Sequence, residues 1–210
     1  TLNFTSATTD AEVYGTDFNA SHASFALDLN EAFGGPAHIY DESFSEFCNR
    51  TDLPKFDFIG LHGIWSWVSE ENRQLIVNFL RTKLAPGGIV YFGYNTLAGW
   101  ASMMPLRDYM SNYIFQQGSR TNSKGDVIAQ AVSQLEQLGE TDPLFLKLHP
   151  ELQGAVAQLK EKPPQYLAHE YFNKDWRPMG FGEMTAWLGE SKLTYGCSAD
   201  LMDQLPNVNF

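Results

Sequence analysis

Apolar and polar positions alternate most clearly along residues 56–94. Residues 56–61 (FDFIGL) form a short, mostly apolar run, as expected of a strand that is buried on both faces of a parallel sheet. Ser69 then provides a helix N-cap, followed by two glutamates and by apolar residues at helical spacing (Leu75, Ile76, Phe79, Leu80 and Leu84). Residues 84–88 (LAPGG) end this helix, and residues 89–92 (IVYF) return to a strand. The pattern predicts a strand–helix–strand unit.

Weaker patterns of the same kind flank this unit. Residues 11–17 are predicted to form a strand with an acid at its C-terminal end, residues 21–33 a helix, and residues 38–40 a short strand. Residues 182–189 are predicted to be helical, and residues 193–197 (LTYGC) to form one more strand. Four or five strands that alternate with helices indicate an α/β fold with a doubly wound, Rossmann-like and mostly parallel sheet.

The alternation of strands and helices stops after Tyr94. Asp126 is a good N-cap for a helix with a single apolar stripe (Val127, Ile128, Ala131, Val132, Leu135 and Leu138). Residues 143–160 are predicted to be helical with an interruption near Pro150, and Pro163-Pro164 should end that segment. We therefore expect a core at residues 1–107, a helical insertion at 108–165, and a return to the core sheet at 166–210.

The composition suits a packed domain and narrows the range of partners. Of 210 residues, 43% are hydrophobic, and no apolar run approaches the length of a membrane span. The net charge of -11 repels phosphate backbones, which disfavours a nucleic-acid substrate and favours basic protein surfaces. Cys48 and Cys197 are the only cysteines, and we expect two buried free thiols in a reducing, cytoplasmic compartment. Because the sequence has no His/Cys cluster, no metal site is expected.

Ligands bind beyond the C-terminal ends of the strands in such sheets, so polar residues at these ends are candidates. Asp17 ends the first predicted strand, where its carboxylate could accept both hydroxyls of a ribose or simply cap a helix. Glu42 and Ser43 follow the next strand. There an acid could accept a hydrogen bond from an adenine amino group, and a backbone N–H could meet a ring nitrogen. Asp41 is adjacent, and one of these two acids is expected to be merely solvated.

A third group of candidates follows the strands at residues 56–61 and 89–92. Gly63 would let the backbone approach a ligand closely, and His62 could orient or deprotonate a nucleophile, or be structural. Trp65 and Trp67 could line a pocket, since aromatic faces attract sulfonium and ammonium cations, or pack in the core. Tyr94 is a candidate orienting group. The sequence His62-Gly63-Ile64-Trp65 also differs from the (Asp/Asn)-Pro-Pro-Tyr motif of nucleic-acid amino-methylases.

Together these segments resemble class I S-adenosylmethionine-dependent methyltransferases. More narrowly, they are similar to the bacterial group with a methyltransferase regulatory domain, which includes protein-lysine methyltransferases. The matching segments are residues 14–19 (YGTDFN), 57–68 (DFIGLHGIWSWV), 91–100, and 169–173 (HEYFN) with the later 176–178 (WRP). The resemblance spans nearly the whole chain, and HGIWSWV is its most specific part, whereas LAPGG is shared across methyltransferases generally.

The resemblance implies S-adenosylmethionine as cofactor and assigns roles by position. Asp17 would bind the ribose, Phe18 would pack near the adenine, Glu42 and Ser43 would read the adenine edge, and His62 and Gly63 would lie beside the methionine moiety. The catalytic residues would be His62, Trp65 and Tyr94. The methyl acceptor would be a protein lysine, and self-association is compatible with the family. The family's first strand and glycine-rich loop would precede Asp17, so we expect the sequence to be a piece that lacks them.

Two other functions stay open. A degenerate, non-catalytic methyltransferase could bind a partner through its helical segment, residues 108–162. A nicotinamide-dependent oxidoreductase would also use an acid such as Asp17 for a ribose. The LAPGG turn and the lack of a Tyr-x-x-x-Lys pair count against the oxidoreductase.

Overall fold

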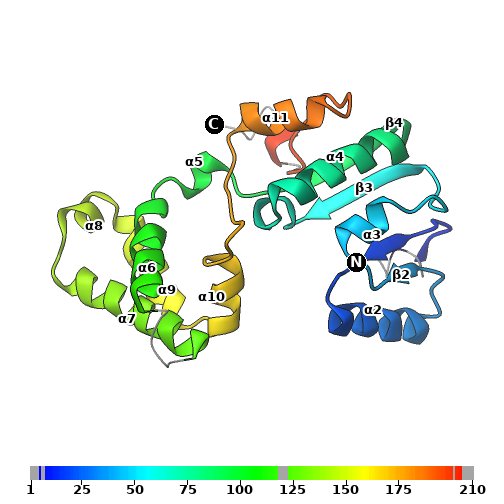
Figure 1. Ribbon diagram of the computed structural model, residues 1–210. Helices are drawn as coiled ribbons and strands as arrows, with labels where there is room; N and C mark the ends of the chain where they lie inside the picture. Colours follow the sequence, from blue (N-terminus) through cyan, green and yellow to red (C-terminus); the bar gives the residue numbers. More distant parts are fainter. Residues whose placement is uncertain (1–4, 6–7, 118–122, 201, 205–210) are drawn as a thin grey trace. The chain divides into compact units, whose positions relative to one another are not determined.

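The computed structural model describes residues 5, 8–117, 123–200 and 202–204 (Figure 1). The chain divides into two compact units. Unit 1 comprises Thr1–Gly60, Ser69–Tyr91 and Thr185–Phe210, and unit 2 comprises Leu61–Val68 and Phe92–Met184. Strands β3 (Phe56–His62) and β4 (Leu84–Gly93) each begin in unit 1 and end in unit 2. The two units are described one after the other.

Unit 1 begins with a pair of short parallel strands and a helix. Strand β1 (Tyr14–Thr16) pairs in register with β2 (His38–Tyr40), with Tyr14 opposite His38 and Thr16 opposite Tyr40. Helix α2 (Ala20–Phe33) connects them and lies beside β2 (Figure 1). The Asn19 side chain accepts a hydrogen bond from Ser21 N at the start of this helix, and Gly34, at φ 62°, ends it in the left-handed conformation that glycine adopts without strain. Strand β1 is shorter than the strand predicted at residues 11–17.

The strand–helix–strand unit is present as predicted, with one shifted boundary. Strand β3 (Phe56–His62) is followed by a 3-10 turn (Trp65–Trp67), helix α4 (Glu70–Lys83) and strand β4 (Leu84–Gly93). Ser69 caps α4 by accepting from Asn72 N, which confirms the predicted N-cap. The LAPGG segment does end the helix, but it already belongs to β4, with Gly87 at φ 82°.

The predicted continuous sheet is confirmed only in part. The described residues form two sheets of two strands each, β1–β2 and β3–β4, rather than one doubly wound sheet. Strand β3 was expected to be buried on both faces, yet most of its residues are exposed or half-buried, and only Leu61 is buried. Aromatic contacts connect the elements of unit 1 instead, in a small core with Phe47, Leu53 and Phe79 at its centre. Helix α3 (Phe44–Cys48) contributes to this core and packs against α4.

Unit 2 is largely helical. Its helices are α5 (Leu97–Trp100), α6 (Met104–Gln117), α7 (Lys124–Glu140), α8 (Leu144–Leu148), α9 (Pro150–Lys160) and α10 (Pro164–Glu170). Helix α7 packs against α6, α9 and α10 (Figure 1), so its apolar stripe lies in the core of the unit, as predicted. The helix breaks at His149, immediately before Pro150, which confirms the predicted interruption.

Two local predictions in the C-terminal half are wrong. The N-cap of α7 is Ser123, whose hydroxyl accepts from Asp126 N and donates to Asp126 Oδ2, so Asp126 lies in the first turn instead. Helix α9 does end at Lys160, before Pro163-Pro164 as predicted, and Pro164 then begins α10, because a proline needs no N–H donor in the first helical turn. Residues 193–197 form no strand, and they follow helix α11 (Phe181–Gly189) as irregular chain. A strand requires a partner, and alternating residues alone do not supply one.

The environment of the two cysteines also differs from the prediction. Cys197 is exposed, and only Cys48 is partly buried. Both thiols are free. Within the described part of the chain, no helix has the length and apolar character that crossing a bilayer requires.

Candidate functional site

In unit 1, Asp17 and Glu42 lie at the C-terminal ends of the two paired strands. Asp17 N donates to Tyr40 O at 3.2 Å, and Thr16 Oγ1 donates to Glu42 O at 2.6 Å. The residues that follow β1 and β2 are therefore held side by side, as the parallel pairing requires. The Asp17 carboxylate also stabilises the turn into α2. It accepts a hydrogen bond from Asn19 N at 2.9 Å and lies 3.3 Å from His22 Nδ1.

The Asp17 side chain nevertheless stays open to ligands. It is 42% exposed, so a carboxylate that already accepts two local hydrogen bonds retains lone pairs that face solvent. The neighbouring Phe18 ring is 77% exposed, which is unusual for so large an apolar side chain. An acid beside an uncovered aromatic ring offers polar and stacking contacts to the same ligand.

The Glu42 carboxylate has one oxygen in use and one without a partner. Its Oε1 accepts from Arg50 Nη1 at 2.6 Å, whereas Oε2 is buried and has no hydrogen-bond partner among the described residues. Arg50 also binds Asp52 and stacks over the Tyr40 ring, with its guanidinium carbon 4.4 Å from the ring centroid. These two carboxylates raise the pKa of Arg50, the hydrogen bonds that Arg50 donates to Asp52 contributing most, so Arg50 stays charged. A buried acceptor without a donor is the kind of group that a ligand N–H can satisfy.

Ser43 has a clear structural role. Its hydroxyl accepts from Glu46 N and its backbone N–H donates to Glu46 Oε2 at 2.9 Å, which together form a capping box at the start of α3. The hydrogen bonds from Ser43 lower the pKa of Glu46. The N–H that we expected to face an adenine ring is thus already engaged in this arrangement.

In unit 2, His62 and Gly63 occupy the end of β3. Gly63 has φ 63°, a conformation that favours glycine, and its N–H donates to Gly93 O at 3.3 Å. The ends of β3 and β4 are therefore adjacent at this point. His62 is exposed, and Tyr94, the residue after β4, is half-buried.

Trp65 is a core residue of unit 2. Its side chain is 0% exposed, its indole packs edge-on against Phe92 at 5.4 Å, and its Nε1–H points to the sulfur of Met179 at 3.0 Å. Of the two roles considered for Trp65, this geometry is that of core packing. Trp67 stacks on His169 with ring centroids 6.0 Å apart, and its indole nitrogen is buried without an acceptor among the described residues.

The strand ends in unit 2 are tied to the loop that precedes α11. Asn95 N donates to Ser66 Oγ at 2.8 Å, Asn95 O accepts from Met179 N, and Ser66 O accepts from Arg177 N at 2.8 Å. Ser66 is 0% exposed, so this polar junction is internal. The HGIWSW motif of the sequence thus fixes the backbone around the end of β3, and His62 is its exposed member.

Each unit therefore brings together a subset of the predicted residues. Asp17, Phe18, Glu42 and Ser43 gather at the β1–β2 end in unit 1, and His62, Gly63 and Tyr94 gather at the β3–β4 end in unit 2. Two further residues belong to the β1–β2 end of unit 1 and were not predicted: Arg50, which holds Glu42, and His22, which holds Asp17. Arg50 could have been noticed as one of few cations in an acidic stretch, whereas nothing local marks His22.

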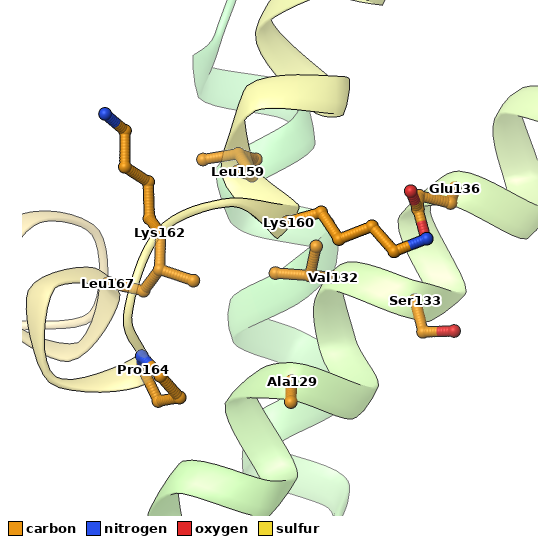
Figure 2. Close-up of a pocket in the computed structure, with 9 residues that line it drawn as sticks. All are labelled: Ala129, Val132, Ser133, Glu136, Leu159, Lys160, Lys162, Pro164 and Leu167. Atoms are coloured by element: carbon orange, nitrogen blue, oxygen red, sulfur yellow. The ribbon is translucent and has the colours of Figure 1, made fainter.

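A hollow of about 290 Å³ lies within unit 2, beside α7 and the segment that joins α9 to α10 (Figure 2). Val132, Leu159 and Leu167 line it, and Lys160 Nζ lies 3.3 Å from Glu136 Oε2 at its edge. None of the predicted site residues lines this hollow. The described residues contain no group of three or more His, Cys, Asp or Glu side chains that could hold a metal ion.

Comparisons with known proteins agree with the resemblance seen in the sequence. Residues 163–210 match the family described as "predicted methyltransferase regulatory domain". The chain is 43% identical to the uncharacterized protein sll1526 of Synechocystis over 200 residues, and 30% identical to the uncharacterized protein RP789 of Rickettsia prowazekii over 153 residues. These matches cover 95% and 70% of the chain, but only 39% and 27% of the relatives. The chain thus spans well under half the length of these relatives.

Solved structures show the same likeness in three dimensions. PKMT2 from Rickettsia typhi in complex with AdoHcy superposes with a TM-score of 0.70 and 23% identity, over 93% of this chain and 36% of that one. PKMT2 from the same organism, described without AdoHcy, gives a TM-score of 0.66 and 20% identity, over 90% and 35% of the two chains. At this level of identity the likeness shows the fold. Residues 163–210 match the methyltransferase regulatory domain family, and over most of its length the chain has the fold of PKMT2.

Proposed function

We propose that the protein transfers a methyl group from S-adenosylmethionine to a nucleophile. One observation supports this proposal most strongly. Over 93% of its length the chain has the fold of a protein that was solved with AdoHcy, the product that S-adenosylmethionine leaves after methyl transfer. The regulatory-domain match at residues 163–210 supports the same class.

The β1–β2 end in unit 1 would hold the nucleoside part of the cofactor. The half-exposed Asp17 carboxylate would accept the two ribose hydroxyls, and the uncovered Phe18 ring would stack near the adenine. Glu42 Oε2, a buried acceptor without a donor, would accept from the adenine amino group, and Arg50 would hold Glu42 in place. Ser43 would contribute at the adenine edge only if its backbone N–H is shared between Glu46 and the ligand.

The β3–β4 end in unit 2 would serve the reacting end. His62 and Gly63 would lie beside the methionine moiety, where Gly63 lets the backbone come close. Tyr94 would orient the acceptor. Trp65 would act through packing, as a positioning residue that keeps the backbone of the motif in place, because its buried indole is already engaged with Met179.

Methyl transfer requires the protein mainly to position the two reactants and to remove a proton from the acceptor. S-adenosylmethionine would supply an activated methyl group on a sulfonium. The acceptor nitrogen must be neutral to attack, so a residue at the site has to accept or relay one proton per transfer. The exposed His62 is suited to this, because a neutral imidazole has a ring nitrogen that can accept a proton. We propose a protein lysine as acceptor. A net charge of -11 favours the approach of basic protein segments, which supports such a substrate over nucleic acid.

The test is methyl transfer by the full-length protein that bears this chain. The protein would be incubated with isotope-labelled S-adenosylmethionine and lysine-rich protein substrates, and methylated lysines would be counted by mass spectrometry. We expect labelled lysines, with a rate reduced at least about tenfold in His62→Gln because general-base contributions are usually of that size or larger. The matched control, His149→Gln, changes a partly exposed histidine at the start of α9 and should keep the full rate.

Two outcomes would contradict the proposal at different levels. Labelled protein without any methylated lysine would keep methyl transfer and reject the lysine substrate. No transfer and no AdoHcy release would favour a non-catalytic methyltransferase-like module that binds a partner.

A further inference from the structure

Arg107 in unit 2 is a half-buried cation without an anionic partner. It lies in the first turn of α6, and no ion pair to it exists within the described ranges of the chain. Its Nε atom is buried and has no hydrogen-bond acceptor among those residues. Burial lowers the pKa of Arg107, because desolvation disfavours the charged form. The neighbouring Asp108 opposes this shift electrostatically but makes no ion pair with the guanidinium.

The Arg107 guanidinium stacks on Trp176, whose indole N–H also lacks a hydrogen-bond acceptor among the described residues. The central carbon of the guanidinium is 4.1 Å from the Trp176 ring centroid. Trp176 is 7% exposed, and its Nε1–H is buried without an acceptor in the described part of the chain. Trp100 packs edge-on against Trp176 at 4.9 Å and against Tyr171 at 5.5 Å, so the indole is fixed in its orientation.

Two buried N–H donors of this cluster, Arg107 Nε and Trp176 Nε1, therefore lack acceptors among the described residues, which is unusual for side chains that serve packing alone. Stacking uses the flat face of a guanidinium, whereas its N–H groups lie in the plane and still require acceptors at the edge. Buried N–H donors are almost always paired, and two adjacent ones without acceptors, next to a positive charge, are rare. Paired oxygen atoms with a negative charge match both the number of donors and the charge.

We propose that Arg107 and Trp176 form a carboxylate-binding site. The guanidinium edge would bind the two carboxylate oxygens, and the Trp176 indole N–H would donate a further hydrogen bond. Trp100 and Tyr171 would form the wall that holds the indole. The carboxylate can come from an acidic protein segment or from a small organic acid, and the experiment below separates these sources. The site is independent of the methyl-transfer proposal, because it involves none of the residues assigned to the cofactor or acceptor.

The experiment follows the indole N–H signals of the ¹⁵N-labelled chain by NMR. The chain has five tryptophans, and the signal of Trp176 is assigned by its loss in Trp176→Phe. Sodium acetate and a short glutamate peptide are titrated separately, with sodium chloride at matched ionic strength as the reference. We expect the Trp176 signal to move downfield and to saturate with acetate, at a dissociation constant of about a millimolar, as a single weak contact would give.

Variants test whether the guanidinium is responsible. Arg107→Gln should weaken binding about tenfold or more, because a charge-assisted hydrogen bond is lost, and Arg107→Lys should fall between the two. Arg81→Gln removes an exposed arginine from α4 in unit 1 and should bind like the wild type. The retained dispersion of the other indole signals shows that each variant is folded.

Either source of carboxylate supports the site. Peptide binding much tighter than acetate binding indicates a protein segment as the ligand, and equal binding per carboxylate indicates a small acid. The proposal is overturned if chloride shifts the Trp176 signal as acetate does, if no titration saturates, or if Arg107→Gln and Arg107→Lys bind like the wild type.

Discussion

The two units bury their apolar side chains to very different extents. Unit 2 has a continuous core of twelve buried residues, among them Met110, Ala131 and Leu135 at 0% exposure. The described core of unit 1 centres on only three buried residues, Phe47, Leu53 and Phe79, and its Phe18 and Phe25 rings are 77% and 64% exposed, although unit 2 also exposes large side chains such as Phe115 at 85%. Helices of unit 2 close a core with neighbours that are near in sequence, whereas two-stranded sheets leave faces and edges open. Stability is thus concentrated in the helices, and the proposed nucleoside contacts lie in the more open unit.

The largest expected effect is the loss of core packing in unit 2. Leu135→Ala, at 0% exposure on α7, should lower the free energy of unfolding by about 2–5 kcal/mol, because it leaves a cavity among packed helices. Leu144→Ala on α8 removes the same atoms from a side chain that is 71% exposed. It should change the free energy of unfolding by less than about 0.5 kcal/mol. Urea unfolding followed by tryptophan fluorescence measures both, since Trp65, Trp67, Trp100 and Trp176 belong to unit 2. Equal losses in the two variants would contradict the contrast.

The cysteines sharpen the comparison within unit 1 itself. Burial raises the pKa of the Cys48 thiol to about 11, whereas Cys197 is exposed. An unperturbed cysteine has a pKa of about 8.5, and only the thiolate form reacts. At pH 8, Cys48 should therefore react with an aromatic disulfide reagent roughly 100-fold more slowly than an unperturbed cysteine does. Cys197 should react at once. Mass spectrometry of peptides after short reaction times distinguishes the two, and rapid labelling of Cys48 would show that α3 is not packed as described.

Equivalent caps in the two units allow a smaller, matched comparison. Ser69 caps α4 in unit 1 and Ser123 caps α7 in unit 2, each by accepting a hydrogen bond from a backbone N–H of the first turn. Alanine at either position should cost about 1 kcal/mol. Hydrogen exchange should show faster opening mainly of the helix whose cap was removed. Ser45→Ala, in which no described side-chain hydrogen bond is lost, is the control and should leave exchange unchanged.

Local patterns predicted the helices well. The apolar stripe of α7 and the Ser69 cap of α4 follow from spacing within a single helix, so the sequence alone reveals them. The sequence favours Asp126 as the N-cap of α7, whereas the structure has Ser123, because both residue types are good caps and only the backbone geometry decides between them. The predicted strand at residues 193–197 failed because pairing depends on a distant partner.

The candidate site was predictable by position but not by contacts. Asp17 and Glu42 follow strands that pair in parallel, so their proximity in unit 1 follows from the order of elements. The Arg50–Glu42 ion pair and the stacking of Arg107 on Trp176 join residues through the fold, and no periodicity marks them. The burial of Trp65 was one of two readings that its sequence context allowed.

The central claim is that the β1–β2 end of unit 1 binds the nucleoside of S-adenosylmethionine. Calorimetric titration of the full-length protein with S-adenosylhomocysteine tests it most directly. We predict saturable binding of one ligand per chain, about 100-fold weaker in Asp17→Ala because two charge-assisted hydrogen bonds are lost, and unchanged in the control Asp28→Ala on the exposed side of α2. Absence of binding by the wild type, or equal binding by Asp17→Ala, would contradict the account.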